Sequence, residues 1–128
     1  MTSSMLRWRD FLMAACLGLA VFAGTAQADE VPIVTGEHWT RSSDEMKKAY
    51  LVGIANVLQV EVAYEATSPP SNAQSLVPRF ARGLKGQTLD GVRDDLNRWY
   101  AAHPDRLNRP VIETIWFEIV VPGLAKAG

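Results

Sequence analysis

The stretch from Ser42 to Glu65 constrains the fold of this chain more than any other part of the sequence. It contains no proline, and apolar residues recur along it at the three- and four-residue spacing of an α-helix. The residues expected to share one buried face are Met46, Tyr50, Gly53, Ile54, Val57, Glu61 and Tyr64. Further valines and leucines make the stretch apolar almost all the way round, so we expect several neighbouring elements to cover it.

Local signals mark both ends of this helix. Ser42 and Glu45 form a capping box, and Asp44 adds negative charge in the first turn, where the helix dipole favours it. The polar, proline-containing run over residues 67–72 is typical of a loop, so the helix is expected to end near residue 65. A glycine at position 53, inside the helix, predicts that a neighbour approaches closely there.

The first 28 residues have the pattern of a secretory signal peptide. Arg7 and Arg9 precede an apolar run over residues 11–24, and Ala26 and Ala28 are the small residues that signal peptidase requires. The run is shorter than the roughly 20 residues that span a bilayer. We therefore expect cleavage after Ala28, a periplasmic location and no membrane span in the cleaved protein.

Composition restricts the partners of residues 29–128, where we expect a single domain. Removing the signal peptide takes away two arginines and one aspartate, which changes the formal net charge from −1 to −2. Binding to phosphates relies on a basic field, so we expect no nucleic-acid partner. Cys16 is the only cysteine, so the expected domain has no disulfide and depends on its apolar core.

The rest of the chain predicts shorter helices joined by loops. Residues 29–41 show no periodicity and are expected to form an irregular lead-in. A weaker helical stretch follows over residues 72–84, either as two short turns or as one helix kinked at Pro78. Gly83 and Gly86 suit a chain reversal after it.

Two further helices complete the expected fold, an all-α bundle of four to five helices. Thr88 is a suitable N-cap for an amphipathic helix over residues 88–103. Its expected buried residues are Leu89, Val92, Leu96, Trp99 and Tyr100, and its expected solvent-facing residues are Arg93, Asp94, Asn97 and Arg98. Residues 110–121 repeat apolar side chains at helical spacing, although many are β-branched and a strand is the rival interpretation. Pro122 is expected to end this element.

No set of residues points to catalysis or to a bound cofactor. His38 and His103 each lack a second ligand at helical spacing, so we expect no metal site. Met46 and His103 are an available pair of haem ligands, but the chain contains no C-x-x-C-H motif. Nucleophile–base motifs are missing as well. The sequence therefore predicts a protein that is not an enzyme and holds no cofactor.

Glu61 is the least expected residue on the apolar side of the long helix. A carboxylate there needs a partner, or else it lies at the rim of the bundle. Arg93, Arg98 or a tyrosine hydroxyl would serve as that partner. We therefore treat Glu61 as a candidate buried or rim carboxylate.

Short motifs spread over residues 29–128 together resemble those of a known family. They are Tyr50 followed by Gly53, Gly86-Gln87-Thr88, Trp99-Tyr100, His103-Pro104-Asp105, and Pro122 at the end of the last helix. In these motifs the chain resembles the immunity proteins of type VI secretion amidases, which are small, exported and all-helical. The paired cysteines usual in that group are missing from residues 29–128. The resemblance implies a periplasmic protein that binds a peptidoglycan amidase and blocks its active cleft.

The preferred interpretation is a protein-binding module without an activity of its own. Partner contacts are expected on polar loops, which vary most readily on a rigid scaffold. The candidate contact residues are Thr67, Ser68, Ser71, Asn72, Lys85 and Gln87. Two alternatives remain open, a helical periplasmic chaperone or stress protein and a carrier of a small molecule or cofactor. Self-association as a homodimer also remains open.

Overall fold

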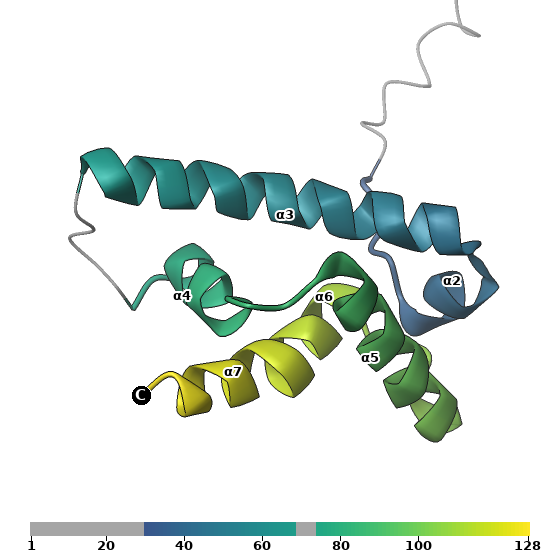
Figure 1. Cartoon of the computed structure of the whole chain (residues 1–128). Helices are drawn as coiled ribbons and strands as arrows, with labels where there is room; N and C mark the ends of the chain where they lie inside the picture. The colour runs from purple at the N-terminus through teal and green to yellow at the C-terminus, as the bar shows by residue number, and fades with distance from the viewer. Residues whose placement is uncertain (1–29, 69–73) are drawn as a thin grey trace, which may run out of the picture. The chain divides into compact units, whose positions relative to one another are not determined.

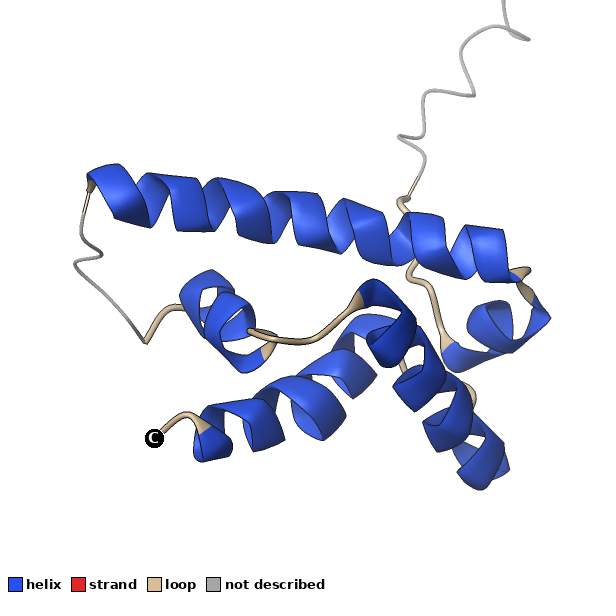
Figure 2. Cartoon of the chain, in the orientation of Figure 1, coloured by secondary structure: helices blue, strands red, loops and turns tan. Residues whose placement is uncertain are grey.

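Helices make up the regular structure of residues 30–68 and 74–128, the part of the chain that the computed structural model describes. The expected signal peptide over residues 1–28 lies outside these residues. Residues Ile33–Gly128 form one unit, and the following description is of that unit. In its described residues no strand occurs, and one isolated antiparallel bridge joins Thr35 to Pro110. The expected all-α class is confirmed (Figure 2).

The elements follow one another with short connections. In chain order they are α2 (Gly36–Arg41), α3 (Asp44–Thr67), α4 (Leu76–Gly83), α5 (Leu89–Ala102), the 3-10 turn η1 (Pro104–Arg106), α6 (Val111–Ile115), the π turn η2 (Trp116–Val120) and α7 (Val121–Lys126). The last three run on as one helix. Figure 1 shows α3 along one side, with α4 and α7 beneath one half and α5 and α6 beneath the other.

Residues 29–41 were expected to be irregular, but the second half of this segment forms a helix. Residues 36–41 form α2, which Thr35 caps together with the side chain of His38. Trp39 on this helix is buried, and its indole nitrogen donates a hydrogen bond of 2.9 Å to the Oδ1 atom of Asn97. The backbone N–H of Gly36 donates to the carbonyl oxygen of Arg109. These contacts stabilise a short helix that has no sequence periodicity of its own.

The predicted cap of α3 is wrong by one residue. The hydroxyl of Ser43, rather than that of Ser42, accepts a hydrogen bond from the backbone N–H of Met46. Ser42 instead ends α2, and its hydroxyl donates to the carbonyl oxygen of His38 at 2.7 Å. Two helices meet at adjacent serines, so each serine serves one helix end.

Predicted helices over residues 72–84 and 88–103 appear as α4 and α5. Pro78 neither breaks nor splits α4, because it lies in the first turn, where backbone N–H groups have no partner within the helix. Thr88 caps α5 as expected, accepting from the backbone N–H of Gly91. Asn97 does not face solvent, however, because its side-chain oxygen accepts from Trp39 and from the Nζ atom of Lys47.

The last element is a helix, so the rival strand is excluded, but Pro122 does not end it. The helix continues to Lys126. A π turn ends at Val120, two residues before the proline, and the N–H of Val121 donates to the carbonyl oxygen of Trp116, five residues earlier. In a regular α-helix the proline ring would meet the carbonyl oxygen of Glu118. The wider π turn therefore explains how the chain carries the helix past the proline.

The core lies where α5 and the last helix meet α2 and the start of α3. Its buried apolar residues are Trp39, Leu51, Phe80, Val92, Leu96, Tyr100, Val111, Ile115, Ile119 and Val120. The Tyr100 hydroxyl is within 3.0 Å of the carbonyl oxygen of Arg109 and within 2.9 Å of the hydroxyl of Thr114, which is fully buried. Burial raises the pKa of the Tyr100 phenol, so it stays protonated and able to donate.

The closest backbone packing is between α4 and the last helix. A Cβ added to Gly83 would lie 2.6 Å from the carbonyl oxygen of Val120, and one added to Gly123 would meet the carbonyl oxygen of Gly83. Both positions therefore require glycine. Gly86 has a φ of 84°, so the predicted chain reversal rests on this second glycine, while Gly83 serves the helix crossing.

Candidate functional site

The side of α3 that faces away from the other helices is exposed and uncharged. We call this surface the outer face of α3, and it consists of Ala49, Val52, Gly53, Asn56, Val57, Val60, Ala63, Tyr64 and Thr67. Val57, Val60 and Tyr64 are 59%, 70% and 61% exposed. Lys48 is the last exposed charge before this surface, and the two later glutamates of α3 are half-buried. A helix on a protein surface normally carries charge on its solvent side.

The predicted buried face of α3 is rotated by roughly a quarter of a turn from the observed one, given a helical repeat of 3.6 residues. Leu51 is the buried residue of the helix, and Ile54 and Leu58 flank it, half-buried. Met46 and Val57, which were expected inside, are exposed. Several neighbours were expected to surround α3, but it packs against α4 and α5 on one side. A nearly uniform apolar sequence contains little information about which side that will be.

Gly53 lies on the outer face of α3, so the expectation of a close neighbour within the chain is wrong. An added Cβ atom at this position would have no atom of the described chain within 4 Å. A glycine inside a helix costs roughly 1 kcal/mol relative to alanine. At Gly53 that cost is not offset by any packing within the described residues.

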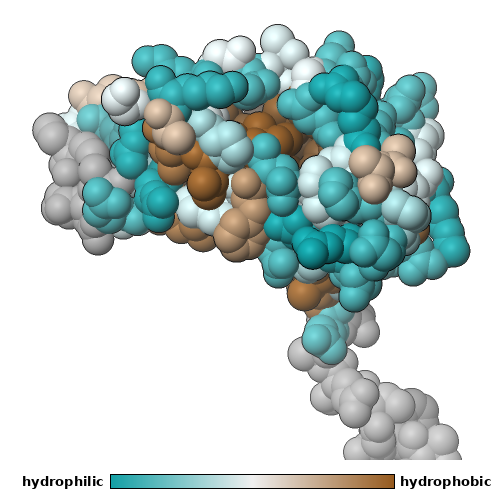
Figure 3. Space-filling model, turned by 90° about the horizontal axis from the view of Figure 1, so that it is seen from below, coloured by the Kyte–Doolittle hydropathy of each residue, from teal (hydrophilic) through white to brown (hydrophobic). Residues whose placement is uncertain are grey.

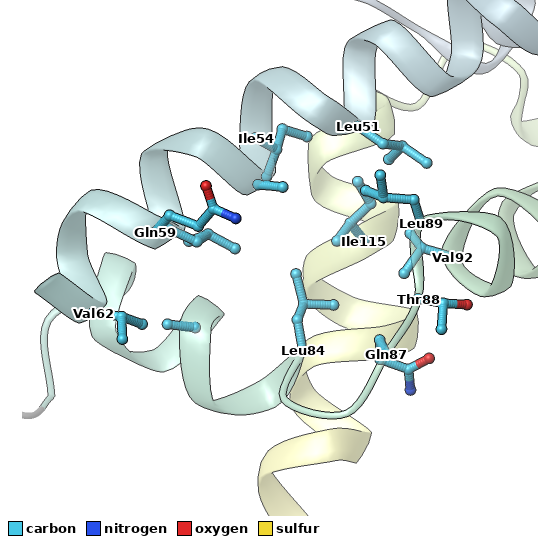
Figure 4. Close-up of a pocket in the computed structure, with 13 residues that line it drawn as sticks. Leu51, Ile54, Gln59, Val62, Leu84, Gln87, Thr88, Leu89, Val92 and Ile115 are labelled. Atoms are coloured by element: carbon cyan, nitrogen blue, oxygen red, sulfur yellow. The ribbon is translucent and has the colours of Figure 1, made fainter.

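Beneath α3 the helices leave an apolar pocket of about 430 Å³. Figure 4 shows Ile54, Gln59 and Val62 of α3 on one side of the hollow and Leu84 on the other. The complete lining is Leu51, Ile54, Ala55, Leu58, Gln59, Val62, Ala81, Leu84, Gln87, Thr88, Leu89, Val92 and Ile115. No charged and no aromatic side chain is among these residues. Protein interiors are otherwise close-packed, so a hollow of this size is a feature of the site.

The polar groups of the pocket lie at its edge. Gln59 and Gln87 are exposed, and neither side-chain amide hydrogen-bonds to another described residue. Thr88 is engaged as the cap of α5. The pocket therefore offers an apolar interior and uncharged hydrogen-bonding groups at its mouth.

The predicted contact residues fall in two places. Thr67 and Ser68 are exposed at the end of α3, and Thr67 continues the outer face one heptad after Val60. Lys85 and Gln87 are exposed in the turn after α4. Ser71 and Asn72 lie outside the described residues.

Glu61 is half-buried, at the margin between the outer face and the packed side of α3. Neither arginine suggested for it is its partner. Arg93 pairs with Asp90 and Asp94, and Arg98 pairs with Asp95 on its own helix.

At the far end of the unit, Arg109 joins α5 to the last helix. Its guanidinium lies 4.9 Å from the ring centre of Trp99 and 5.3 Å from that of Phe117, and it pairs with Glu118 at 2.9 Å. His103 stacks on Trp99, and its Nδ1 atom is 2.7 Å from the carbonyl oxygen of Trp99. These contacts satisfy the polar groups locally, so we interpret the cluster as structural.

Chemistry-bearing groups do not converge elsewhere in the described chain. Within residues 30–68 and 74–128, no three histidine, cysteine, aspartate or glutamate side chains lie close enough together to hold a metal ion. Among the same residues, none of the helices has the length and hydropathy needed to cross a membrane.

The face of the molecule opposite α3 carries both hydrophilic and apolar residues (Figure 3). Figure 3 views the face opposite α3, where hydrophilic residues dominate and apolar ones gather toward the end formed by α4 and α7. Leu76, Val77 and Val121 are exposed on these helices.

Comparisons with models of protein families, with curated proteins and with solved structures find no match to this chain.

Proposed function

We propose that this chain acts by binding another protein and that the outer face of α3 is the contact surface. The observation that carries the proposal is that no exposed residue of α3 from Ala49 to Thr67 is charged. Contiguous exposed apolar surface on a soluble domain marks interaction sites. Exposure of apolar side chains to water is unfavourable, so a partner that covers this face gains the free energy of apolar burial.

The geometry of the outer face suits a helical or otherwise elongated apolar surface on the partner. Val57, Val60 and Tyr64 follow one another at three- and four-residue spacing and form one stripe. Gly53 and Ala63 beside this stripe are small, which lets a partner approach the α3 backbone closely. Tyrosine and valine side chains supply the apolar contact area.

The partner class is taken from the family resemblance. The motifs from Gly86 to Asp105 resemble those of immunity proteins, whose action is to occlude a peptidoglycan amidase. Such occlusion requires a rigid scaffold and a surface of constant shape, and a long helix supplies both. We therefore propose an exported peptidoglycan amidase as the partner and inhibition by occlusion as the function.

A double substitution on the outer face tests this proposal. Val57→Lys combined with Val60→Lys places two charges on the stripe, and Ala101→Lys places one on an exposed site of α5 as the control. The unchanged chain and the control are expected to bind a peptidoglycan amidase of the same organism and stop its cleavage. The double variant is expected to bind about tenfold or more weakly, with an unchanged unfolding temperature. Equal binding by all three chains would show that the contact lies elsewhere.

The same surface also favours one alternative, a chaperone that captures unfolded proteins. An exposed apolar face binds many sequences when it recognises no particular shape. Suppressed aggregation of acid-unfolded proteins, without binding to any amidase, would support the chaperone. A second copy of the chain is a further possible occupant, and light scattering over a range of concentrations detects it.

A further inference from the structure

We propose that the pocket beneath α3 is a binding site for an uncharged, single-chain aliphatic amphiphile. The site lies on the opposite side of α3 from the proposed protein contact and does not depend on it. Its volume of about 430 Å³ falls in the range of small-molecule sites, roughly 300–1,000 Å³.

The lining selects the body of the ligand. Leucine, isoleucine, valine and alanine side chains form the interior, and they come from α3, α4, α5 and α6 (Figure 4). Aromatic rings that would stack on a planar ligand are not among the lining residues; Trp39, Phe80 and Tyr100 belong to the packed core instead. A flexible alkyl chain fits such a surface better than a rigid ring system, because it adapts to an irregular aliphatic wall.

The electrostatics select the end of the ligand. Charged side chains are missing from the lining, so a carboxylate or ammonium group drawn into the pocket would find no counter-charge. The amides of Gln59 and Gln87, at the edge, can donate to and accept from a hydroxyl, ester or amide group. An alcohol or a neutral ester therefore matches the pocket, with its alkyl chain inside and its polar end at one of these glutamines on the edge (Figure 4).

Filling an apolar pocket of this size with a ligand is also energetically favourable. Water in it would find few hydrogen-bond partners away from the edge, and an empty hollow forfeits dispersion contacts along its lining. Each methylene that enters is expected to tighten binding roughly fourfold until the pocket is full. Affinity should thus rise from octanol to dodecanol.

Direct calorimetric titration of the purified full chain tests the ligand class. Dodecanol is expected to bind about tenfold or more tightly than dodecanoate or dodecyltrimethylammonium. Equal affinity for the charged and uncharged compounds would overturn the assignment of a neutral ligand. Failure of every alkyl compound to bind would overturn the site.

Substitutions that fill the pocket test its location. Ala81→Leu places extra carbon atoms in the hollow, and Ala101→Leu makes the same change on the exposed side of α5 as the matched control. The first is expected to weaken dodecanol binding at least about tenfold, and the second to leave it unchanged. Ala55→Leu fills the hollow from α3 and decides the question if the Ala81 variant does not fold. Unchanged binding in both filled variants would overturn the proposal, whereas Val57→Lys/Val60→Lys should bind dodecanol normally.

Discussion

The two sides of α4 are packed differently. Toward the last helix, Gly83 and Gly123 bring two backbones into direct contact, and no side chain separates them. Toward α3, α4 is also in contact with its neighbour, but an apolar pocket opens between the two helices. Backbone contact leaves no room for a methyl group on one side, while the other side has room for a ligand. The comparison indicates that the contact between α4 and the last helix fixes the fold and that α3 is the element available for binding.

α3 and the last helix also differ in how many of their apolar side chains are buried. The last helix buries Val111, Ile115 and Val120 completely or almost completely. α3 is longer, yet Leu51 is its one buried residue. Stability therefore comes mainly from the core around α5 and the last helix, since apolar burial is the dominant favourable term in folding.

The largest expected difference between the two regions comes from one substitution made in each. Leu96→Ala removes a fully buried side chain from the packed core and should lower the free energy of unfolding by about 2–5 kcal/mol. Leu58→Ala removes a half-buried side chain that already borders the pocket, so a loss of only about 1 kcal/mol is expected. Denaturant titration of both variants measures the difference. Equal losses would mean that the pocket side of α3 is packed as tightly as the core.

Sequence patterns identified the helices better than the faces they bury. The predicted α5 is correct in its cap, in its end at His103, and in the burial of Val92, Leu96 and Tyr100, because its apolar and charged residues alternate clearly. α3 offers no such contrast, and its predicted face is therefore wrong. A short helix such as α2 depends on contacts with distant residues, which sequence periodicity does not record.

Features produced by packing were not predictable from the sequence. The role of Gly83 appears only when the last helix crosses α4, and the continuation of the last helix beyond Pro122 depends on the π turn before it. The apolar pocket is a space between helices, so no residue pattern marks it. Thr67 lies on the outer face and Gln87 lines the pocket, but their role as partner contacts stays a prediction. Val57, which is exposed on α3, was expected in the core.

A smaller effect is expected from adding one methyl group at the helix crossing. Gly123→Ala places a Cβ atom against the carbonyl oxygen of Gly83, and neither backbone can yield without moving a helix. The free energy of unfolding should fall by about 1–3 kcal/mol, the usual cost of overpacking. Thermal unfolding of Gly123→Ala, compared with that of Gly53→Ala, where the same added methyl group meets open space, measures it. An unchanged stability would show that α4 and the last helix are not in backbone contact.

The smallest expected effect has the opposite sign, and it connects the packing of α3 with its proposed function. Gly53→Ala adds a methyl group where the chain has open space, so the helix should gain about 0.5–1 kcal/mol of stability from alanine's higher helix propensity. If a partner lies on the outer face of α3, the same methyl group enters that contact. The chain alone should then unfold at a higher temperature, while its complex with the amidase becomes weaker. Calorimetry of the free variant and titration with the partner separate the two effects. A gain in stability with unaltered binding would mean that no partner covers Gly53, and a loss of stability would mean that Gly53 is packed within the chain.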